Sequence, residues 1–184
     1  TGSTNSDLLA EATLGAPDRP VLMTDHQTAG RGRLGRTWDA PPGANLLVSI
    51  LFRDVPDRPV TLTHRVGLAA VDAVREVAGT VATLKWPNDV LVEGRKLAGI
   101  LAQRAADGPV VVGVGLNVSW APEGSALVGA SVSPAAVLDA LLTAYDGLPV
   151  DASDRYREAL STLGAAVRAE LPDGTIEGRA DAVE

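Results

Sequence analysis

The sequence predicts an α+β fold in which helices flank a mixed, largely antiparallel sheet. Two apolar runs, Leu97–Arg104 and Val110–Val118, are separated by Asp107-Gly108, a dipeptide typical of the turn of a β-hairpin. Thr61–Val77 carries apolar residues at the spacing of one helix face. The chain has 184 residues, of which 46% are hydrophobic, so it is long enough to bury a substantial core.

Capping and turn residues divide the rest of the chain into further elements. A short helix is expected at about Asp7–Leu14, with Asn5 or Ser6 as its cap and Gly15 at its end. Apolar runs predict additional strands, and the remaining helical patterns predict two more helices. The expected strands are Val21–Asp25, Asn45–Arg53, Val81–Trp86 and Val90–Val92, and the expected helices are Val132–Tyr145 and Asp154–Leu163.

The C-terminal segment is expected to form a unit of its own. Ala165–Leu171 and Thr175–Ala180 flank Pro172-Asp173-Gly174, which is typical of a turn, and therefore predict a hairpin. A two-stranded hairpin is only marginally stable by itself. We therefore expect residues 164–184 to be part of a small β-barrel and residues 1–163 to form the main domain.

Composition limits both the location and the partners of the protein. The chain has 23 acidic and 16 basic side chains and a net charge of −7, whereas broad nucleic-acid binding normally requires a basic face. It has no cysteine, which excludes disulfides and cysteine nucleophiles. It has neither a signal-like N-terminus nor an apolar run that could span a membrane, so we expect a cytoplasmic protein without membrane or nucleic-acid contacts.

The strongest local signal is the segment Gly30–Arg36, which reads Gly-Arg-Gly-Arg-Leu-Gly-Arg. Glycines let backbone N–H groups approach a ligand, and each guanidinium offers a planar fork of donors to a phosphate or carboxylate. The segment also fits the glycine patterns of nucleotide-binding loops, but these require a helix directly afterwards, and Pro41-Pro42-Gly43 cannot continue one. We therefore interpret it as a cationic flap between strands that binds a small anion. The alternative is a solvated surface loop.

Lysine is rare in this chain, because arginine supplies all the basic side chains except Lys85 and Lys96. Where arginine is the usual surface cation, a retained lysine indicates a site that needs a compact point charge. The alternative is that both are ordinary surface lysines. His26 and His64 do not form a pattern typical of a metal site, and we assign no metal-ligating residues.

Five short motifs together resemble those of the biotin protein ligases. They are Gly-Ser-Thr-Asn-Ser at 2–6, Gln-Thr-Ala-Gly-Arg-Gly-Arg-Leu-Gly-Arg at 27–36, Lys-Trp-Pro-Asn-Asp at 85–89, Lys-Leu-Ala-Gly-Ile-Leu at 96–101 and Gly-Val-Gly-Leu-Asn-Val at 113–118. The resemblance implies a catalytic fold related to class II aminoacyl-tRNA synthetases, followed by part of a small SH3-like barrel. It also implies that biotin and MgATP form biotinyl-5′-AMP and pyrophosphate, and that a lysine of a biotin carboxyl carrier domain then receives the biotin.

The residues of these motifs suit the different parts of biotin. A buried ureido group needs neutral donors and acceptors, which serine, threonine, asparagine and glutamine side chains supply. On its own, Ser3–Ser6 is more often a helix cap, and strand glycines are more often ordinary core. The expected biotin-binding residues are Ser3, Thr4, Asn5, Gln27, Gly30, Arg31, Gly32, Arg33, Lys96, Gly99, Ile100, Gly113 and Gly115.

Attack of a carboxylate on the α-phosphate of ATP brings two anions together, and cations and Mg²⁺ must cancel their repulsion. Lys96 is expected to bridge the two groups, and Asp89 to organise the metal or orient the incoming lysine. The expected nucleotide-binding residues are Arg31, Arg33, Arg36, Trp38, Lys85, Asn88, Lys96 and Asn117, and the expected catalytic residues are Lys96, Arg33, Arg31 and Asp89.

Two other functions remain open on sequence alone. A lipoate-protein ligase of similar fold activates a different acid by the same chemistry, and a non-catalytic biotin- or nucleotide-sensing module binds ligand without forming an adenylate. The arginine flap and Lys85–Asp89 resemble the biotin branch more closely, although Leu34 stands where some relatives carry another arginine. We expect a monomer or weak homodimer. No segment before Thr1 supports the repressor activity of some relatives.

Overall fold

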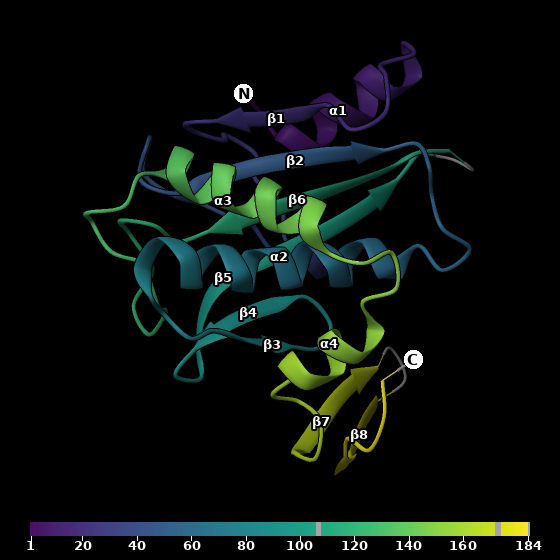
Figure 1. Ribbon diagram of the computed structural model, residues 1–184, viewed down its shortest axis with the longest axis vertical. Coiled ribbons are helices and arrows are strands. Elements are labelled where there is room, and N and C mark those ends of the chain that lie inside the picture. The colour runs from purple at the N-terminus through teal and green to yellow at the C-terminus, as the bar shows by residue number, and fades with distance from the viewer. Residues whose placement is uncertain (106–107, 172–173, 184) are drawn as a thin grey trace.

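The computed structural model describes residues 1–105, 108–171 and 174–183. Its centre is a six-stranded sheet with the order β1-β2-β6-β5-β4-β3, in which neighbouring strands are antiparallel (Figure 1). The strands are β1 (Val21–Thr24), β2 (Leu46–Phe52), β3 (Thr83–Lys85), β4 (Asp89–Val92), β5 (Arg95–Arg104) and β6 (Val110–Leu116). The predicted α+β fold with a largely antiparallel sheet is therefore confirmed.

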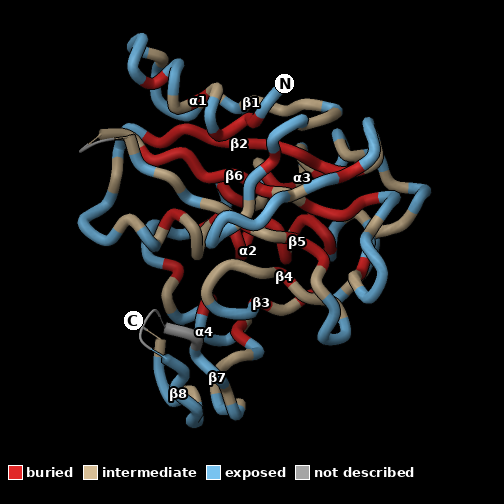
Figure 2. Tube along the Cα trace, turned by 180° about the vertical axis from the view of Figure 1, so that it is seen from behind, coloured by how far each residue is buried: buried red, intermediate tan, exposed pale blue. Residues whose placement is uncertain are grey.

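Helices pack on both faces of this sheet. The helices α2 (Val60–Ala78) and α3 (Pro134–Gly147) lie together over one face, whereas α1 (Thr4–Thr13) packs on the other (Figure 1). Because side chains alternate along a strand, β2 sends one set of apolar residues toward α2 and α3 and the buried Leu51 toward α1. Seen from behind, exposed loops cross this second face in front of the buried strands (Figure 2).

The observed helices and strands differ from the expected bounds mainly at their ends. Helix α1 begins at Thr4 rather than near Asp7, because the backbone of Ser3 is extended and Ser3 already serves as the N-cap. Helix α3 begins at Pro134, where the Ser133 hydroxyl accepts a hydrogen bond from the Ala136 N–H at 3.1 Å. The start of α3 thus has a side-chain cap, whereas the Ser3 side chain makes no capping hydrogen bond to α1.

The expected helix Asp154–Leu163 is wrong at its C-terminal end. Helix α4 spans only Ser153–Ala159. Leu160 then leaves the helix and forms a parallel bridge with Leu84, and the Ser161 N–H donates to the Leu84 carbonyl at 2.8 Å. Pairing with the free edge of β3 therefore competes with continuation of the helix, which the local sequence pattern does not reveal.

The C-terminal hairpin is confirmed as strands β7 (Ala166–Leu171) and β8 (Gly174–Arg179), which pair in antiparallel register. The expected turn residues Pro172 and Asp173, and Asp107 of the earlier turn, lie outside the described residues. The side chains of β8 are exposed, including Ile176. No helix in the described ranges is both long enough and apolar enough to cross a membrane.

Candidate active site

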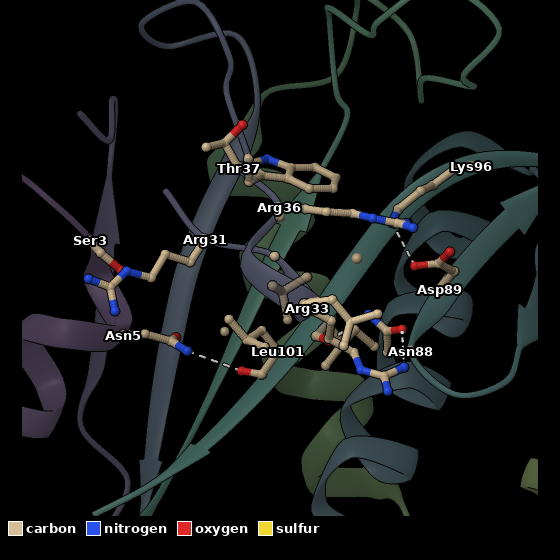
Figure 3. Close-up of a pocket in the computed structure, with 18 of the residues that line it drawn as sticks. Ser3, Asn5, Arg31, Arg33, Arg36, Thr37, Asn88, Asp89, Lys96 and Leu101 are labelled. Carbon is tan, nitrogen blue, oxygen red and sulfur yellow. Dashed lines mark hydrogen bonds and ion pairs between the residues drawn. The ribbon is translucent and has the colours of Figure 1, made fainter. Parts of the chain in front are cut away.

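A cavity of about 290 Å³ lies on the sheet face opposite α2 and α3 (Figure 3). Its walls come from several separate segments: Ser3 and the start of α1, Gln27, the flap, Val48 of β2, the segment 85–89, and strands β5 and β6. All the predicted site residues line it except Gly30 and Asn117. The predicted residues found there are Ser3, Thr4, Asn5, Gln27, Arg31, Gly32, Arg33, Arg36, Trp38, Lys85, Asn88, Asp89, Lys96, Gly99, Ile100, Gly113 and Gly115.

One end of the cavity is neutral and polar. Gln27 Oε1 accepts hydrogen bonds from the Thr4 N–H at 2.9 Å and the Thr4 hydroxyl at 3.1 Å. Asn5 Nδ2 donates to the Leu101 carbonyl at 3.1 Å and to Gln103 Oε1 at 2.9 Å. Thr4 and Asn5 are almost fully buried, so this end presents fixed, uncharged donors and acceptors to a ligand.

Ser49 belongs to this polar end, although we did not predict it. Its side chain is fully buried in β2, and its hydroxyl donates to Asn5 Oδ1 at 2.6 Å and lies 2.7 Å from Thr4 Oγ1. The sequence does contain a signal, because Ser49 is the one polar residue inside the apolar run 46–52. A buried hydroxyl needs a partner, and this one holds both α1 side chains in place.

Glycines form the floor of the cavity. Gly99 and Gly115 are opposite each other in β5 and β6, and the Trp38 indole lies over both. A Cβ atom at Gly115 would lie 2.4 Å from the indole, and one at Gly113 would lie 2.2 Å from Asn5 Oδ1. The floor therefore requires glycine at these positions, because Trp38 and Asn5 approach the strand backbone closely.

The flap is a narrow loop closed by its own backbone. Arg31 and Thr37 form an antiparallel bridge, and the Trp38 N–H donates to the Gly30 carbonyl at 3.0 Å. At its tip is a single 3-10 turn, η1 (Arg33–Gly35), in which Leu34 has a φ of 56° and is exposed. An extended segment follows this turn, so the expectation of a flap without a phosphate-loop helix is confirmed.

The three flap arginines are spread along the cavity. In Figure 3, Arg31 points toward Ser3 and Asn5, whereas Arg36 points toward Lys96. Arg33 Nη1 donates to Asn88 Oδ1 at 3.2 Å, which ties the flap tip to the loop after β3. In the part of the chain that the structure describes, none of the three pairs with a carboxylate. Their guanidinium groups are therefore available to an anionic ligand.

Lys96 and Asp89 form the other end of the cavity. Lys96 Nζ lies 2.7 Å from Asp89 Oδ1 and 5.6 Å from the centroid of the Trp38 ring. The register of β4 and β5 shifts at Val90 and Leu91, so that β5 contains one extra residue. Such a bulge re-aims side chains, and here it lets Lys96 reach the same cavity as Gly99, three residues further on.

Gly30 and Asn117 lie outside this lining. A Cβ atom at Gly30 would lie 2.2 Å from the Trp38 carbonyl oxygen, so this glycine permits closure of the flap, and it borders a neighbouring cavity of about 750 Å³. Asn117 is buried, accepts from Asn45 Nδ2 at 3.3 Å and donates to the Ala126 carbonyl at 3.0 Å. Its contacts hold the connection after β6. Its predicted contact with the nucleotide stays a prediction.

His64 lies on the side of α2 that contacts α4. Its ring stacks on Tyr156 of α4, with centroids 3.7 Å apart and planes inclined by 14°. Burial lowers the pKa of His64 to about 4 and raises the pKa of Tyr156 to about 12, since each charged form would lose hydration. The neutral pair joins α2 to α4 behind the cavity.

A neutral polar end, a glycine floor and a cationic end define a site for an elongated ligand that carries an anionic group.

Comparisons with known proteins identify the family to which a chain with this site belongs. Residues 3–118 match the Biotin/lipoate A/B protein ligase family. The chain is 42% identical to biotin–[acetyl-CoA-carboxylase] ligase from Mycobacterium tuberculosis, over 95% of this chain and 73% of that protein.

Two further relatives extend the comparison. The chain is 35% identical to biotin–[acetyl-CoA-carboxylase] ligase from Paracoccus denitrificans, over 90% of this chain and 74% of that protein. The crystallised biotin protein ligase from Aquifex aeolicus, in complex with biotin and ATP, aligns with a TM-score of 0.77 at 25% identity, covering 96% of this chain and 82% of that one. The chain therefore belongs to the Biotin/lipoate A/B protein ligase family.

Proposed function

We propose that this chain is a biotin protein ligase, which forms biotinyl-5′-AMP and pyrophosphate from biotin and MgATP and then biotinylates a lysine of a biotin carboxyl carrier domain. The observation that carries the proposal is a single cavity that combines a buried neutral polar end with an end rich in arginine and lysine. Biotin has the matching order of groups: an uncharged ureido ring, an apolar tail and a carboxylate. The identity to the Mycobacterium tuberculosis ligase supports the same conclusion.

In this proposal the ureido ring lies at the neutral end. Its carbonyl and N–H groups exchange hydrogen bonds with water for hydrogen bonds with the side chains of Ser3, Thr4, Asn5 and Gln27. Ser49 already holds two of these side chains, Thr4 and Asn5, in place. The bicycle and tail then extend over the glycine floor against Trp38. This direction brings the carboxylate toward Lys96.

The first step is attack of a biotin carboxylate oxygen on the α-phosphorus of ATP. A new bond joins oxygen to phosphorus, the bond to the β-phosphate bridging oxygen breaks, and pyrophosphate leaves. Lys96 exchanges its contact with Asp89 for contacts with the carboxylate and the α-phosphate, while Arg31, Arg33 and Arg36 hold the phosphates. Each charge-assisted hydrogen bond is worth about 1.5–3 kcal/mol.

The second step is attack of the carrier's lysine amine on the acyl carbon of the adenylate. The acyl carbon–nitrogen bond forms, AMP leaves with the anhydride oxygen, and the amine loses a proton. Asp89 is positioned to orient that amine once Lys96 has turned to the phosphate. A mixed anhydride hydrolyses readily, so closure of the flap and Trp38 over it protects the intermediate until the carrier arrives.

Mg²⁺ enters this scheme with ATP as its counter-ion. In the described ranges no three His, Cys, Asp or Glu side chains come together as a metal site. Asp89 is the one carboxylate among the described residues lining the cavity, and its oxygens suit a hard cation. When bound, the metal neutralises phosphate charge, and Asp89 and Asn88 are the residues that would face it.

The remaining expectations concern the whole protein. Residues 1–163 form the catalytic domain, and residues 164–184 form part of an SH3-like barrel, for which the β7–β8 hairpin is the supporting observation. The absence of cysteine supports a cytoplasmic enzyme. A monomer or weak homodimer, and the lack of nucleic-acid partners, stay predictions.

A lipoate-protein ligase and a non-catalytic sensor are the alternatives. Lipoate lacks a ureido group, so its head group would offer the polar side chains at the neutral end no matching hydrogen-bond donors and acceptors. The test is mass spectrometry of the protein incubated with MgATP and either biotin or lipoate, followed by a carrier domain. Biotinyl-AMP and then a biotinylated lysine are expected. Formation of lipoyl-AMP alone would instead establish a lipoate-protein ligase. Binding of biotin without adenylate formation would establish a non-catalytic sensor.

A further inference from the structure

The chain directly after α4 holds the loop that follows β3. We call residues 160–162 the clamp. Leu160 pairs in parallel with Leu84, and the Leu84 carbonyl accepts from the Ser161 N–H at 2.8 Å and the Ser161 hydroxyl at 2.9 Å. The Trp86 N–H donates to the Thr162 hydroxyl oxygen at 2.9 Å, across a separation of 76 residues. The clamp thus fixes the backbone immediately before Pro87-Asn88-Asp89.

This position matters because β3 has only three residues and lies at the edge of the sheet. Its inner side pairs with β4, and the clamp satisfies the Leu84 carbonyl and the Trp86 N–H on the outer side. Lys85, directly before Trp86 at the end of β3, and Asn88 and Asp89, just beyond it, all line the cavity. A small change in the direction of the backbone at Trp86 therefore displaces several cavity side chains at once.

The clamp is itself anchored to the main domain. Arg155 donates to both carboxylate oxygens of Asp72, at 3.1 and 2.9 Å, and Tyr156 stacks on His64. Both contacts join α4 to α2, which packs on the sheet. Beyond the clamp the chain continues into the β7–β8 hairpin, where the Gly164 N–H donates to the Ala180 carbonyl at 2.8 Å. The clamp therefore connects the rigid core and the C-terminal hairpin to one wall of the cavity.

We propose that Thr162 is a positioning residue for the nucleotide half of the site. Thr162 is not among the residues that line the cavity, so it acts through the loop rather than on a ligand. Its hydroxyl accepts the Trp86 N–H and sets the direction in which Lys85 and Asn88 face the nucleotide. The inference rests on the proposed function, since only there does this loop bind ATP. The neutral end of the cavity shares no hydrogen bond with the clamp in the described residues.

The test compares Thr162→Val, which keeps the shape but removes the acceptor, with Thr162→Ser, which keeps the hydroxyl. Thr175→Val, an exposed position in β8, is the matched control. Three quantities are measured for each variant: the KM for MgATP in biotinyl-AMP formation, the Kd for biotin, and the hydrogen-exchange rate of the Trp86 amide. Thr162→Val is expected to raise the KM for MgATP about three- to tenfold, the effect of one neutral hydrogen bond. It is also expected to speed exchange at Trp86 and to leave the Kd for biotin unchanged.

Thr162→Ser and Thr175→Val are expected to behave like the wild type. An unchanged KM for MgATP in Thr162→Val, or an equal loss of biotin and ATP binding, would overturn the inference. If the wild-type protein forms no adenylate, the proposed function fails, and the exchange rate still tests the clamp. Unchanged exchange at Trp86 in Thr162→Val would then show that the hydroxyl does not hold the loop.

Discussion

Gly99 and Gly115 face each other across β5 and β6, and the Trp38 indole occupies the space that larger side chains would fill. Trp38 Nε1 is buried and has no hydrogen-bond partner among the described residues. Burial of an unpaired donor is unfavourable, and a ligand acceptor at this point would remove the penalty. At the residue scale, two features therefore define the site: Gly99 and Gly115, which have no side chain, and the unpaired N–H of Trp38.

Replacing Gly115 by alanine is expected to weaken biotin binding and adenylate formation together, by about tenfold or more. The new Cβ atom would lie 2.4 Å from the indole, so Trp38 must move away from the floor. Titration with biotin and a single-turnover adenylate assay measure the two effects. Gly178→Ala is the matched control, because a Cβ atom at that strand position meets open space. Wild-type biotin affinity in Gly115→Ala would contradict the assigned floor.

Arg33 offers a second residue-scale prediction. Arg33→Ala is expected to speed release of biotinyl-AMP by about 10- to 100-fold, the range for one or two charge-assisted hydrogen bonds, and to change biotin affinity much less. The guanidinium lies beside Asn88, at the nucleotide side of the cavity. Dissociation is followed by chasing bound adenylate with excess biotin. Arg95→Ala, which removes an arginine paired only with Glu93 among the described residues, is the control. Equal rates of biotinyl-AMP release from Arg33→Ala and Arg95→Ala would contradict the role of Arg33 in retaining the adenylate.

At the scale of elements, sequence patterns predicted the parts that are locally determined. The long helix and the β5–β6 hairpin follow from apolar periodicity, and the flap follows from the prolines after it. The clamp could not be predicted, because Leu160 pairs with Leu84 only after the sheet has formed. The bulge that turns Lys96 into the cavity is also a property of strand pairing and has no local sequence signal. The role of Ser49 was not predicted, although Ser49 is the one polar residue in the apolar run 46–52.

The contact between α2 and α4 gives a pH prediction. Burial lowers the pKa of His64 to about 4 in the folded protein, below its ordinary value of 6.5. Between these values the unfolded chain binds a proton that the folded chain does not, so the free energy of unfolding falls as pH decreases from 6.5 toward 4. The slope from this group is at most about 1.4 kcal/mol per pH unit, and smaller because the ring is partly exposed.

Denaturant titrations over that pH range test this prediction. His64→Phe keeps a ring for stacking on Tyr156 but cannot titrate, so its stability is expected to fall less steeply than that of the wild type. Above the ordinary pKa of histidine the difference between the two proteins is expected to be constant. If the free energies of unfolding of the wild type and His64→Phe fall in parallel between pH 6.5 and 4, His64 does not cause the pH dependence of stability.

At the scale of the whole molecule, the antiparallel sheet brings all five sequence motifs to one cavity. Residues from 3–5, 27–38, 85–89, 96–101 and 113–115 are spread along the chain, yet the strand order places them around the same site. The net charge of −7 contrasts with a flap whose three arginines have no carboxylate partner in the described ranges. The positive charge of the flap is therefore a local feature of an acidic chain, and it suits a small anionic ligand. Sequence motifs predicted which residues meet there and their division between a neutral set and a cationic set, whereas the direction in which each flap arginine points comes only from the structure (Figure 3).

That division is tested most directly by Lys96→Ala. Biotin binding, followed by calorimetric titration, is expected to stay measurable and to weaken much less than adenylate formation, because the neutral end that holds the ureido ring is formed by α1, Gln27 and Ser49. Biotinyl-AMP formation, measured by mass spectrometry in the same samples, is expected to fall at least about 100-fold, since the lost cation faces the reacting anions. Adenylate formation at the wild-type rate, or equal loss of biotin binding and adenylate formation, would contradict the account.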